Sequence, residues 1–597
     1  MKSAALFTGL LVSSSRYATA QSTSSFDWTK LRPSASLEYS KCYGSLKCAK
    51  LGIPMDWLSN STHNATEVSL AIVALPATVP EDDPSFGGTI IVNPGGPGGS
   101  GVEFVLEAGE LIQGVVDGNK HYEILSFDPR GVGYSEPKAD CYNDELARDV
   151  TALSLRGMGP LSGGSNVVRR QAALLGAYGS LCEGEKIHEF MSTASVARDM
   201  VQIVDKIDEL RSSNGTSSAK LRTRGGPRRM QSRQENDLPR IQYWGFSYGT
   251  VLGNYFASMF PGRVDRMILE GVVDIHDYNA ASWSKNLQDT QKDYDQLFIN
   301  CFEAGSHCAL YEPGDSGPSD IRARVDAFLQ QLDESPAQIV TNSSIEEITR
   351  ADVTAIIFQA LYQPQEYFPR AANVVAKGME GDFSTVYASL GTPQSAEYCP
   401  TTIPKTYTWI QDVEIAVGCG DAESANDQTI PEFQSYLTDI QEQSPDFGPA
   451  WAQLRLACRG WRVRPKYRFT GPFTSPAADP SGAPGKPKAP ILFVSSQYDP
   501  VTPYANAVAM AKEHAGARVL LQESPGHATL FSPGKCREHY VRKYFETGEL
   551  PPEGTVCQPD CKPFRDCPSA PAGKRSVGLA AEKSFPPPNR GPLGIAW

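Results

Sequence analysis

Short apolar runs alternate with amphipathic helical patterns between residues 89 and 274. The runs are rich in β-branched and aromatic residues, which favour strands. They predict strands at 89–93, 122–128, 241–246 and 264–272. Residues 194–210 place apolar side chains at helical spacing after a capping Ser192 or Thr193. Alternation of this kind predicts an α/β fold, with a mostly parallel sheet and helices on both faces.

The strand pattern fades in the middle of the chain and returns near its end. Residues 276–485 have the pattern of helices interrupted by proline, and strand-like runs resume at 489–496 and 517–524. The simplest explanation of this order is a single α/β domain that contains a long insertion. We therefore predict a large, mainly helical cap at 276–485 and a core made of residues 35–275 and 486–560.

Other segments lack the pattern of a packed domain. Residues 1–20 carry Lys2, a short apolar run and an A-x-A sequence at 18–20, which is typical of a signal peptide. Residues 211–240 are polar and basic, and we interpret them as a disordered surface insertion in preference to a processing site or a patch that binds polyanions. Residues 568–597 are polar and proline-rich, which indicates a flexible tail.

The composition narrows the class of protein. The 597 residues are 40% hydrophobic, so the chain can bury a large core. The formal net charge of -13 repels nucleic acid overall, so we predict no nucleic-acid partner. No segment after the signal peptide approaches the roughly 20 uninterrupted apolar residues that a spanning helix needs. We therefore predict a secreted protein without a membrane anchor.

The chain has 13 cysteines, and several are closely spaced. Cys42 lies near Cys48, Cys301 lies near Cys308, and another group is close to the C-terminus, which predicts disulfides formed in an oxidising compartment. Neither C-x-x-C pairs nor a Cys/His cluster with metal-ligand spacing occurs, so we predict no metal. The odd count leaves one thiol unpaired, for which Cys399 is our candidate. Glycosylation sequons occur at Asn60, Asn64, Asn214 and Asn342.

The sequence IQYWGFSYGT, at 241–250, places Ser247 in a G-x-S-x-G motif. A motif this short arises by chance in a chain with 52 glycines, so its context decides its meaning. Strand-like sequence leads into Gly245, and an amphipathic helix follows Gly249, which is the strand, sharp turn and helix order of a nucleophile elbow. Glycine at both positions suits the close approach of the backbone in such a turn. We predict that Ser247 is a catalytic nucleophile.

A serine nucleophile needs a histidine to accept its proton and a carboxylate to orient that histidine. In α/β-hydrolases both follow the serine, the acid first, each on a loop after a late strand. Asp499 follows the predicted strand 489–496, and His527 follows 517–524. Among 8 histidines, His527 alone follows a strand in a loop of small residues. We therefore predict a triad of Ser247, Asp499 and His527 on an α/β-hydrolase fold.

The glycine-rich sequence PGGPGGSG, at 94–101, follows the predicted strand 89–93. Backbone N–H groups in such a loop stabilise the negative charge that develops on a substrate carbonyl. We predict that the N–H groups of Gly96 and Tyr248 form this oxyanion hole. A phosphate-binding loop is the competing interpretation, but G-x-x-x-x-G-K-S/T is absent and no G-x-G-x-x-G opens a βαβ unit here.

A second serine segment, Gly314-Asp315-Ser316-Gly317, resembles the active-serine sequence of trypsin-like proteases. Neither a matching histidine segment nor a double-barrel strand pattern accompanies it. We predict that this segment is a loop of the cap.

Five segments of the chain are similar to motifs of one known family. They are NPGGPGGSG (93–101), SFDPRGVGYSEP (126–137), WGFSYGT (244–250), QYDPVTP (497–503) and SPGHATL (524–530). Together they resemble the secreted tripeptidyl aminopeptidase-like branch of the proline iminopeptidase family of α/β-hydrolases, including its TAP-like C-terminal region. The resemblance spans about residues 40 to 560 and includes cap cysteines within 415–421 and 456–461.

The resemblance implies a serine hydrolase without a cofactor that acts on peptide substrates near a free N-terminus, through an acyl-enzyme. It matches the predicted triad and oxyanion hole to those of the family. It also implies a cap carboxylate that pairs with the substrate ammonium, an interaction that stays strong where water is excluded. Asp421 and Glu414 are both candidates, and either is equally interpretable as a structural acid.

Other functions remain as alternatives. An esterase or lipase uses the same triad, because the cap and not the triad sets the substrate class. A non-catalytic binding protein with this fold is a further alternative, which a complete triad disfavours. An epoxide hydrolase or dehalogenase is disfavoured because those enzymes usually have aspartate in place of Ser247.

Overall fold

The structure is a computed structural model, and it describes residues 26–59, 67–142, 145–184, 186–213, 238–340, 345–390, 410–565 and 567. The signal peptide 1–20, the tail 568–597 and most of the insertion 211–240 lie outside these residues. So do the glycosylation sites Asn60, Asn64, Asn214 and Asn342 and the candidate free thiol Cys399. All of these stay predictions.

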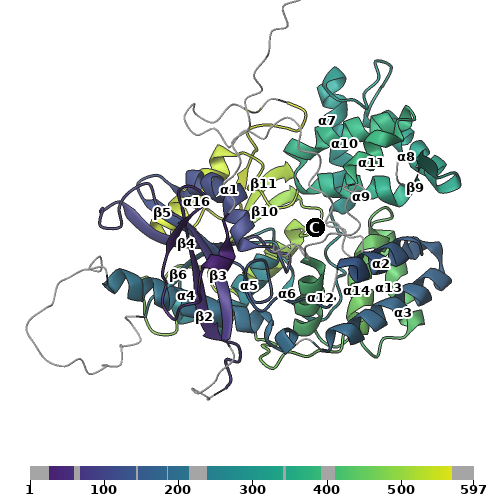
Figure 1. Cartoon of the computed structure of the whole chain (residues 1–597). Helices are drawn as coiled ribbons and strands as arrows, with labels where there is room; N and C mark the ends of the chain where they lie inside the picture. The colour runs from purple at the N-terminus through teal and green to yellow at the C-terminus, as the bar shows by residue number, and fades with distance from the viewer. Residues whose placement is uncertain are drawn as a thin grey trace, which may run out of the picture.

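A 10-stranded sheet forms the left part of the molecule in Figure 1. In spatial order its strands are β1 (Ser40–Cys42), β2 (Leu46–Pro54), β3 (Glu67–Leu75), β5 (His121–Phe127), β4 (Phe86–Asn93), β6 (Ile241–Phe246), β7 (Val264–Glu270), β10 (Leu492–Tyr498), β11 (Arg518–Pro525) and β12 (Val556–Cys557). Strands β1, β2, β3 and β5 pair antiparallel, and every pair from β5 to β12 is parallel. The predicted strands are confirmed as β4, β5, β6, β7, β10 and β11. The antiparallel edge was not predicted, because the strand and helix alternation begins only at residue 89.

Helices cover both faces of this sheet, as predicted. Neighbouring residues of a strand point to opposite faces: Ile90 and Trp244 join one hydrophobic cluster, and Ile91 and Tyr243 join the other. The first face carries α1 (Gly101–Val116) and α16 (Lys535–Thr547), and the second carries α4 (Thr193–Ser213), α5 (Tyr248–Met259) and α15 (Tyr504–Glu513). Helix α4 confirms the helix predicted at 194–210. The arrangement is the α/β-hydrolase fold.

A mainly helical part lies beside the sheet, at the right in Figure 1. Its elements are α6 (Ile275–Asn279), α7 (Thr290–Ala304), α8 (Pro318–Glu334), α9 (Arg350–Tyr362), α10 (Pro364–Met379), α11 (Phe383–Ser389), α12 (Ile410–Asp421), α13 (Ile430–Gln443), α14 (Gly448–Gly460) and the hairpin β8 (Ala337–Val340) with β9 (Ile345–Ile348). Two earlier helices, α2 (Glu145–Arg156) and α3 (Ser165–Cys182), lie in the same part, where α3 packs against α13 and α14. The sequence range assigned to the core therefore contains a helical excursion that joins the cap helices. Single turns of 3-10 helix occupy Trp28–Lys30, Leu161–Gly163, Lys186–Phe190, Pro261–Arg263 and Gly305–His307.

Disulfides close short and long loops in both parts of the molecule. The bonded pairs are Cys42–Cys48, Cys141–Cys182, Cys301–Cys308, Cys419–Cys458, Cys536–Cys557 and Cys561–Cys567. The predicted disulfides are thus confirmed, and bonds of this kind are typical of an oxidising compartment. Among the residues that the structure describes, no helix is long and apolar enough to cross a membrane. The same residues contain no group of three or more His, Cys, Asp and Glu side chains placed to hold a metal.

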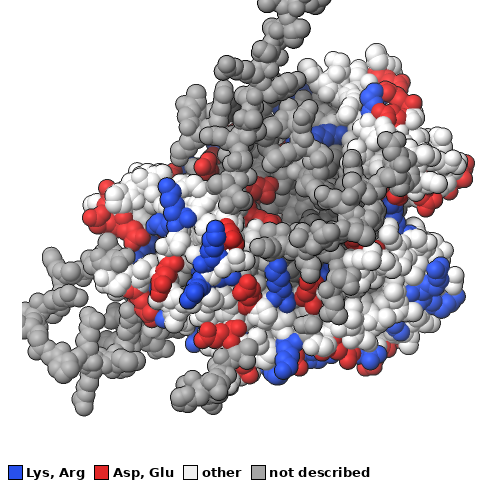
Figure 2. Space-filling model, in the orientation of Figure 1, with Lys and Arg blue, Asp and Glu red and all other residues white. Residues whose placement is uncertain are grey.

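Charges of both signs are mixed on the face of the molecule shown in Figure 2. Blue and red side chains lie side by side over the sheet part, and both colours recur over the helical part. On this face the negative excess of the chain is therefore spread among basic residues rather than gathered in one acidic area.

Candidate active site

Ser247 lies at a sharp turn between strand β6 and helix α5. Its backbone has φ 55° and ψ -125°. Residues other than glycine rarely adopt this conformation, which carries strain of about 1–3 kcal/mol. A Cβ at Gly245 would lie 2.4 Å from the carbonyl oxygen of Gly249, and a Cβ at Gly249 would lie 2.8 Å from that of Asn93. Only glycine fits both positions, so the sequence G-x-S-x-G is what allows this turn to form.

Asp499 and His527 lie on the loops that follow strands β10 and β11. The His527 Nδ1 atom is 2.9 Å from Asp499 Oδ1 and 3.1 Å from Oδ2. Asp499 is fully buried, and it also accepts hydrogen bonds from the backbone N–H groups of Val501, Thr502 and Ala528, at 3.1, 2.7 and 2.8 Å. These bonds satisfy a buried carboxylate and fix it against the imidazole ring.

The turn of Ser247 and the loop of His527 are neighbours at the carboxyl ends of the parallel strands. The Ser247 N–H donates to the carbonyl of Glu270 at 3.0 Å. The next residue, Gly271, lies against the imidazole, because a Cβ there would be 3.2 Å from His527 Cε1. No hydrogen bond joins the Ser247 hydroxyl to His527 among the described residues, and catalytic hydrogen bonds of this kind often tighten only when substrate binds.

The glycine loop after β4 lies directly against the Ser247 turn. Gly95 and Gly96 have φ of 102° and 108°, and a Cβ at Gly95 would lie 2.8 Å from Ser247 Cβ and 2.9 Å from the backbone nitrogen of Tyr248. Within the described chain, the N–H groups of Gly96 and Tyr248 donate to no other group. The two amides predicted to form the oxyanion hole therefore belong to adjacent backbone segments and are both available to a ligand.

Asp128 holds the other end of that glycine loop. Its carboxylate accepts from the Ser100 hydroxyl at 2.6 Å and from the N–H groups of Val102 and Tyr134 at 3.0 and 2.7 Å. Burial raises the pKa of Asp128 to about 6, against the lowering effect of these three donors. Sequence reasoning did not single out Asp128, although it lies in the motif at 126–137.

Glu270 holds the loop that follows His527. It is fully buried at the end of β7, and its Oε1 atom accepts from the N–H and the hydroxyl of Thr529 at 2.6 and 2.7 Å. Its Oε2 atom accepts from Trp244 Nε1 at 2.9 Å. The main chain and the side chain of one residue thus fix both the Ser247 turn and the histidine loop. Sequence reasoning missed Glu270 because its partners are distant in the chain.

The junction of helices α9 and α10 covers the imidazole. The Tyr362 ring packs edge-on against the His527 ring at 5.1 Å between centroids, and the His527 N–H donates to the Tyr362 carbonyl at 3.0 Å. Burial, and then the negative charges of Asp499 and Glu414, raise the pKa of Tyr362. The Tyr362 hydroxyl is buried and has no hydrogen-bond partner in the described chain.

The structure separates the two carboxyl groups predicted to bind a substrate amine. Asp421 is already engaged: it accepts from the N–H and hydroxyl of Thr193 at 3.0 and 2.5 Å and from the Tyr278 hydroxyl at 2.9 Å. Burial raises its pKa to about 6. Glu414 is 2% exposed, its Oε2 atom has no partner in the described part of the chain, and burial alone raises its pKa well above the ordinary value. Only Glu414 has the free hydrogen-bonding capacity of a ligand-binding group.

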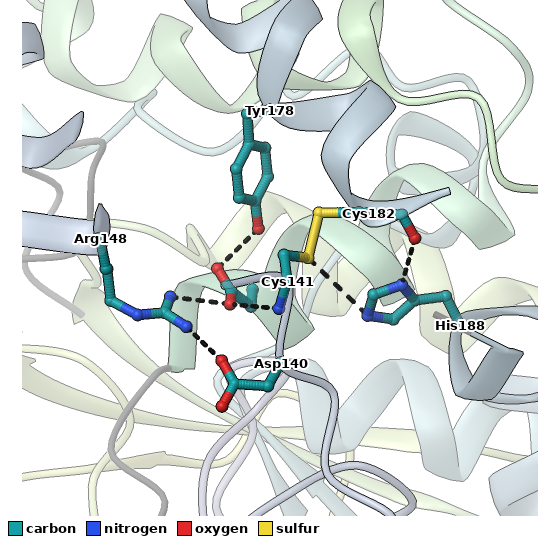
Figure 3. Close-up of a disulfide and its surroundings, with 7 residues drawn as sticks. Asp140, Cys141, Arg148, Tyr178, Cys182 and His188 are labelled. Carbon is teal, nitrogen blue, oxygen red and sulfur yellow. Dashed lines mark hydrogen bonds and ion pairs between the residues drawn. A yellow bond between two sulfur atoms is a disulfide. The ribbon is translucent and has the colours of Figure 1, made fainter. Parts of the chain in front are cut away.

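Helix α12, which carries Glu414, is anchored by a polar cluster next to a disulfide (Figure 3). Asp412 accepts from Arg148 Nη1 at 2.7 Å and from the Tyr178 hydroxyl at 2.6 Å. Arg148 also binds Asp140, and the disulfide between Cys141 and Cys182 links the chain segments that carry these partners. At its other end α12 is bonded through the disulfide Cys419–Cys458 to α14. Glu414 thus lies on a helix that is fixed at both ends.

The trypsin-like serine segment has a structural role. Ser316 is exposed in the loop before α8, and its N–H and hydroxyl both donate to Asp320 Oδ2 at 2.7 Å. Asp315 pairs with Arg324 of the same helix. The segment is a loop of the helical part, as predicted.

The chain is similar to several known hydrolases. Residues 444–557, which include Asp499 and His527, match a family described as TAP-like protein. The tripeptidyl aminopeptidase of Streptomyces lividans is 24% identical over 528 residues, which cover 87% of this chain and 84% of that protein. The serine protease Hip1 of Mycobacterium tuberculosis is 22% identical over 542 residues, covering 89% and 90%. Carboxylesterase B of the same species is 27% identical over 531 residues, covering 86% of each chain. Together with the fold, these matches support a TAP-like α/β-hydrolase.

Proposed function

We propose that this protein is a secreted serine exopeptidase that releases short peptides from free N-termini through an acyl-enzyme. The observation that carries the proposal is Glu414, a buried carboxyl group on helix α12 of the cap whose Oε2 atom has no hydrogen-bond partner in the described part of the chain. The names of the tripeptidyl aminopeptidase and serine protease relatives support it. The predicted signal peptide and the disulfides support secretion.

In the proposed reaction the Ser247 hydroxyl attacks the scissile carbonyl carbon while His527 Nε2 accepts its proton. Asp499 binds Nδ1 and so keeps the imidazole in the tautomer whose Nε2 is free to accept. The N–H groups of Gly96 and Tyr248 stabilise the oxyanion. His527 then gives its proton to the leaving amine, and water, activated in the same way, releases the N-terminal fragment.

Glu414 supplies the specificity for a free N-terminus. In the absence of a cation the buried carboxyl group holds its proton, because burial disfavours the charged form. A substrate ammonium restores the charged form by forming a charge-assisted hydrogen bond in a site that excludes water. An N-acylated peptide has no ammonium, so it leaves Glu414 unpaired and binds less well.

The first test is a panel of substrates. We expect the purified protein to cleave Ala-Ala-Pro-anilide with a kcat/KM roughly 100-fold above that for its N-acetylated form, since losing one partner of a buried charge pair costs about 2–5 kcal/mol. Release of the anilide measures both rates, and nitrophenyl esters are assayed beside them. Cleavage of esters alone would rule out the peptidase proposal, and equal rates with and without the acetyl group would rule out amine recognition.

The second test is Glu414→Gln. We expect it to lower kcat/KM for free-amine peptides roughly 100-fold and to leave the N-acetylated peptide and ester rates within about 3-fold. In the unchanged protein, binding an ammonium must displace the proton of Glu414, so KM should fall as pH rises toward the pKa of the substrate amine, about 8. Glutamine removes this titrating group and with it the pH dependence of KM. Glu423→Gln, an exposed carboxyl group just after α12, is the matched control.

An ester substrate is the second candidate. The relative named carboxylesterase B matches 86% of the chain, about as much as the two peptidase relatives match, and the catalytic chemistry is shared. An esterase needs no carboxyl group for an ammonium. The effect of Glu414→Gln on peptide and ester substrates therefore separates the two candidates.

A further inference from the structure

Helix α7 and the segment that leads into it are bonded to the backbone of both candidate catalytic loops. Asn286 Nδ2 donates to the Val501 carbonyl at 2.9 Å, and the Thr290 hydroxyl donates to the Pro500 carbonyl at 2.5 Å. Both acceptors follow Asp499 directly in the chain. One turn further along the helix, Asp293 reaches the loop of His527 instead.

The N–H of Gly526, the residue before His527, is shared between two acceptors. It donates to Asp293 Oδ1 at 3.2 Å and to the Tyr498 carbonyl, at the end of β10, at 3.1 Å. Gly526 has a φ of 104°, and a Cβ on it would lie 2.5 Å from Pro364 Cδ, so the start of helix α10 packs closely against this residue. The bond to Asp293 is therefore part of what sets the direction in which the histidine leaves the main chain.

The surroundings of Asp293 disfavour a charge on it. The residue is fully buried, its Oδ2 atom has no hydrogen-bond partner, and no ion pair reaches it within the described chain. Burial, and then the negative charges of Asp499 and Asp289, raise its pKa well above the ordinary value. The other titratable or charged side chains on the elements around it are engaged elsewhere: His527 with Asp499, Tyr362 on His527, and Arg322 of α8 with Asp295 and Asp326.

We propose that Asp293, as a neutral carboxylic acid, is a positioning residue that holds the Gly526 peptide and thereby orients His527. The neutral form provides a second acceptor for the Gly526 N–H, beside the Tyr498 carbonyl, without placing a second negative charge near Asp499. A charged Asp293 would favour the imidazolium form of His527, which is unable to accept the serine proton. The inference rests on the catalytic roles proposed above for Asp499 and His527.

The neutral form makes asparagine a suitable replacement and alanine an unsuitable one. Asparagine keeps an uncharged acceptor for the Gly526 N–H, so Asp293→Asn should keep kcat within about 3-fold. Asp293→Ala removes one of the two acceptors of that N–H and leaves the Tyr498 carbonyl as the other. The histidine loop then loses its bond to helix α7, and a small displacement of a catalytic group lowers rates on the order of 10- to 100-fold. We expect that loss in kcat, with KM within about 2-fold, because Asp293 contacts the histidine loop and not the substrate.

The experiment measures kcat, KM and the pH dependence of kcat/KM for the full-length protein on a free-amine peptide anilide and on a nitrophenyl ester. The matched control is Glu303→Gln, which removes a carboxylate at the far end of the same helix that pairs with Lys562 at 2.9 Å. The acid limb of the pH profile should be the same in Asp293→Asn and the unchanged protein, because no charge is removed. Thr290→Val, which removes the bond to Pro500, should lower kcat about 3-fold and extends the test to the other loop.

Two results would overturn the proposal. If Asp293→Asn moves the acid limb to lower pH, Asp293 is charged in the working enzyme and its neutral role is wrong. If the Asp293→Ala protein folds and keeps full kcat, the bond to Gly526 does not orient the histidine. If the alanine variant does not fold, a loss of kcat above 10-fold in Asp293→Asn overturns the proposal instead. Ser247→Ala is assayed in parallel: activity that survives it removes the proposed mechanism itself, whereas activity lost there but kept in the Asp293 variants removes only this inference.

Discussion

Ser247→Ala is expected to lower kcat by about 10⁴- to 10⁶-fold on peptide and ester substrates alike. A residue that forms the covalent intermediate cannot be replaced by its neighbours, and losses of this order follow removal of the nucleophile in serine proteases. KM should change little, because the cap and the oxyanion hole remain. Rates are measured with anilide and nitrophenyl substrates, at enzyme concentrations high enough to detect residual turnover.

The fold should survive this substitution. Alanine adopts the positive φ of the turn about as poorly as serine, so the strain of the elbow is the same in both proteins. Ser316→Ala, in the exposed loop before α8, is the control for the loss of a serine hydroxyl. A fluorophosphonate probe should label the unchanged protein and Ser316→Ala but not Ser247→Ala. Retention of full activity by Ser247→Ala would contradict the proposed mechanism.

The parts of the fold that were predictable have strong local signals. Strands β4, β6, β10 and β11 are apolar runs bounded by glycine or proline, and the turn at Ser247 needs glycine at two fixed positions because of backbone contacts within a few residues. The loops with Asp499 and His527 were located by their order after strands. Local sequence was therefore enough to predict the sheet, the turn at Ser247 and the two candidate loops.

The supporting residues were not predictable because their roles depend on distant partners. Glu270 binds Thr529, 259 residues away, and Asp293 binds Gly526, 233 residues away. The choice between Asp421 and Glu414 depends on Thr193 and Tyr278, which bind the first carboxyl group. The Oε2 atom of the second has no partner among the residues described. The pattern of apolar and polar positions predicts local elements, but it does not predict which distant residues will contact each other.

The placement of helices α2 and α3 has a similar explanation. Both are amphipathic helices between two strands of the core, which is also the sequence pattern of a helix that covers the sheet. Helix α3 instead packs against helices from the distant segment 430–460, and Arg148 of α2 binds Asp412 of α12. The disulfide Cys141–Cys182 joins the two ends of this excursion. The helical part of the molecule is thus built from two separate insertions rather than from one.

Asp199→Ala is expected to destabilise the protein by about 3–5 kcal/mol, because it leaves a buried guanidinium without its counter-charge. Arg130 binds both oxygens of Asp199, through Nε at 2.6 Å and Nη2 at 2.7 Å, and both side chains are fully buried. Trp57 Nε1 also donates to Asp199, at 2.7 Å. The pair joins helix α4 to the loop after β5 that contains Asp128, so the loss should appear as a lower urea midpoint for unfolding of the core.

A second carboxylate on helix α4 provides the control for this prediction. Asp205 pairs with Arg263 at 2.6 Å, but its side chain is 32% exposed, so Asp205→Ala should cost less than about 1 kcal/mol. The double replacement Arg130→Met with Asp199→Leu should be more stable than Asp199→Ala, because it removes the unpaired charge together with its partner. If Asp199→Ala shifts the urea midpoint no more than Asp205→Ala does, the buried pair is not what fastens α4 to the loop. If the double variant is no more stable than Asp199→Ala, the loss of stability comes from the cavity and not from the unpaired charge of Arg130.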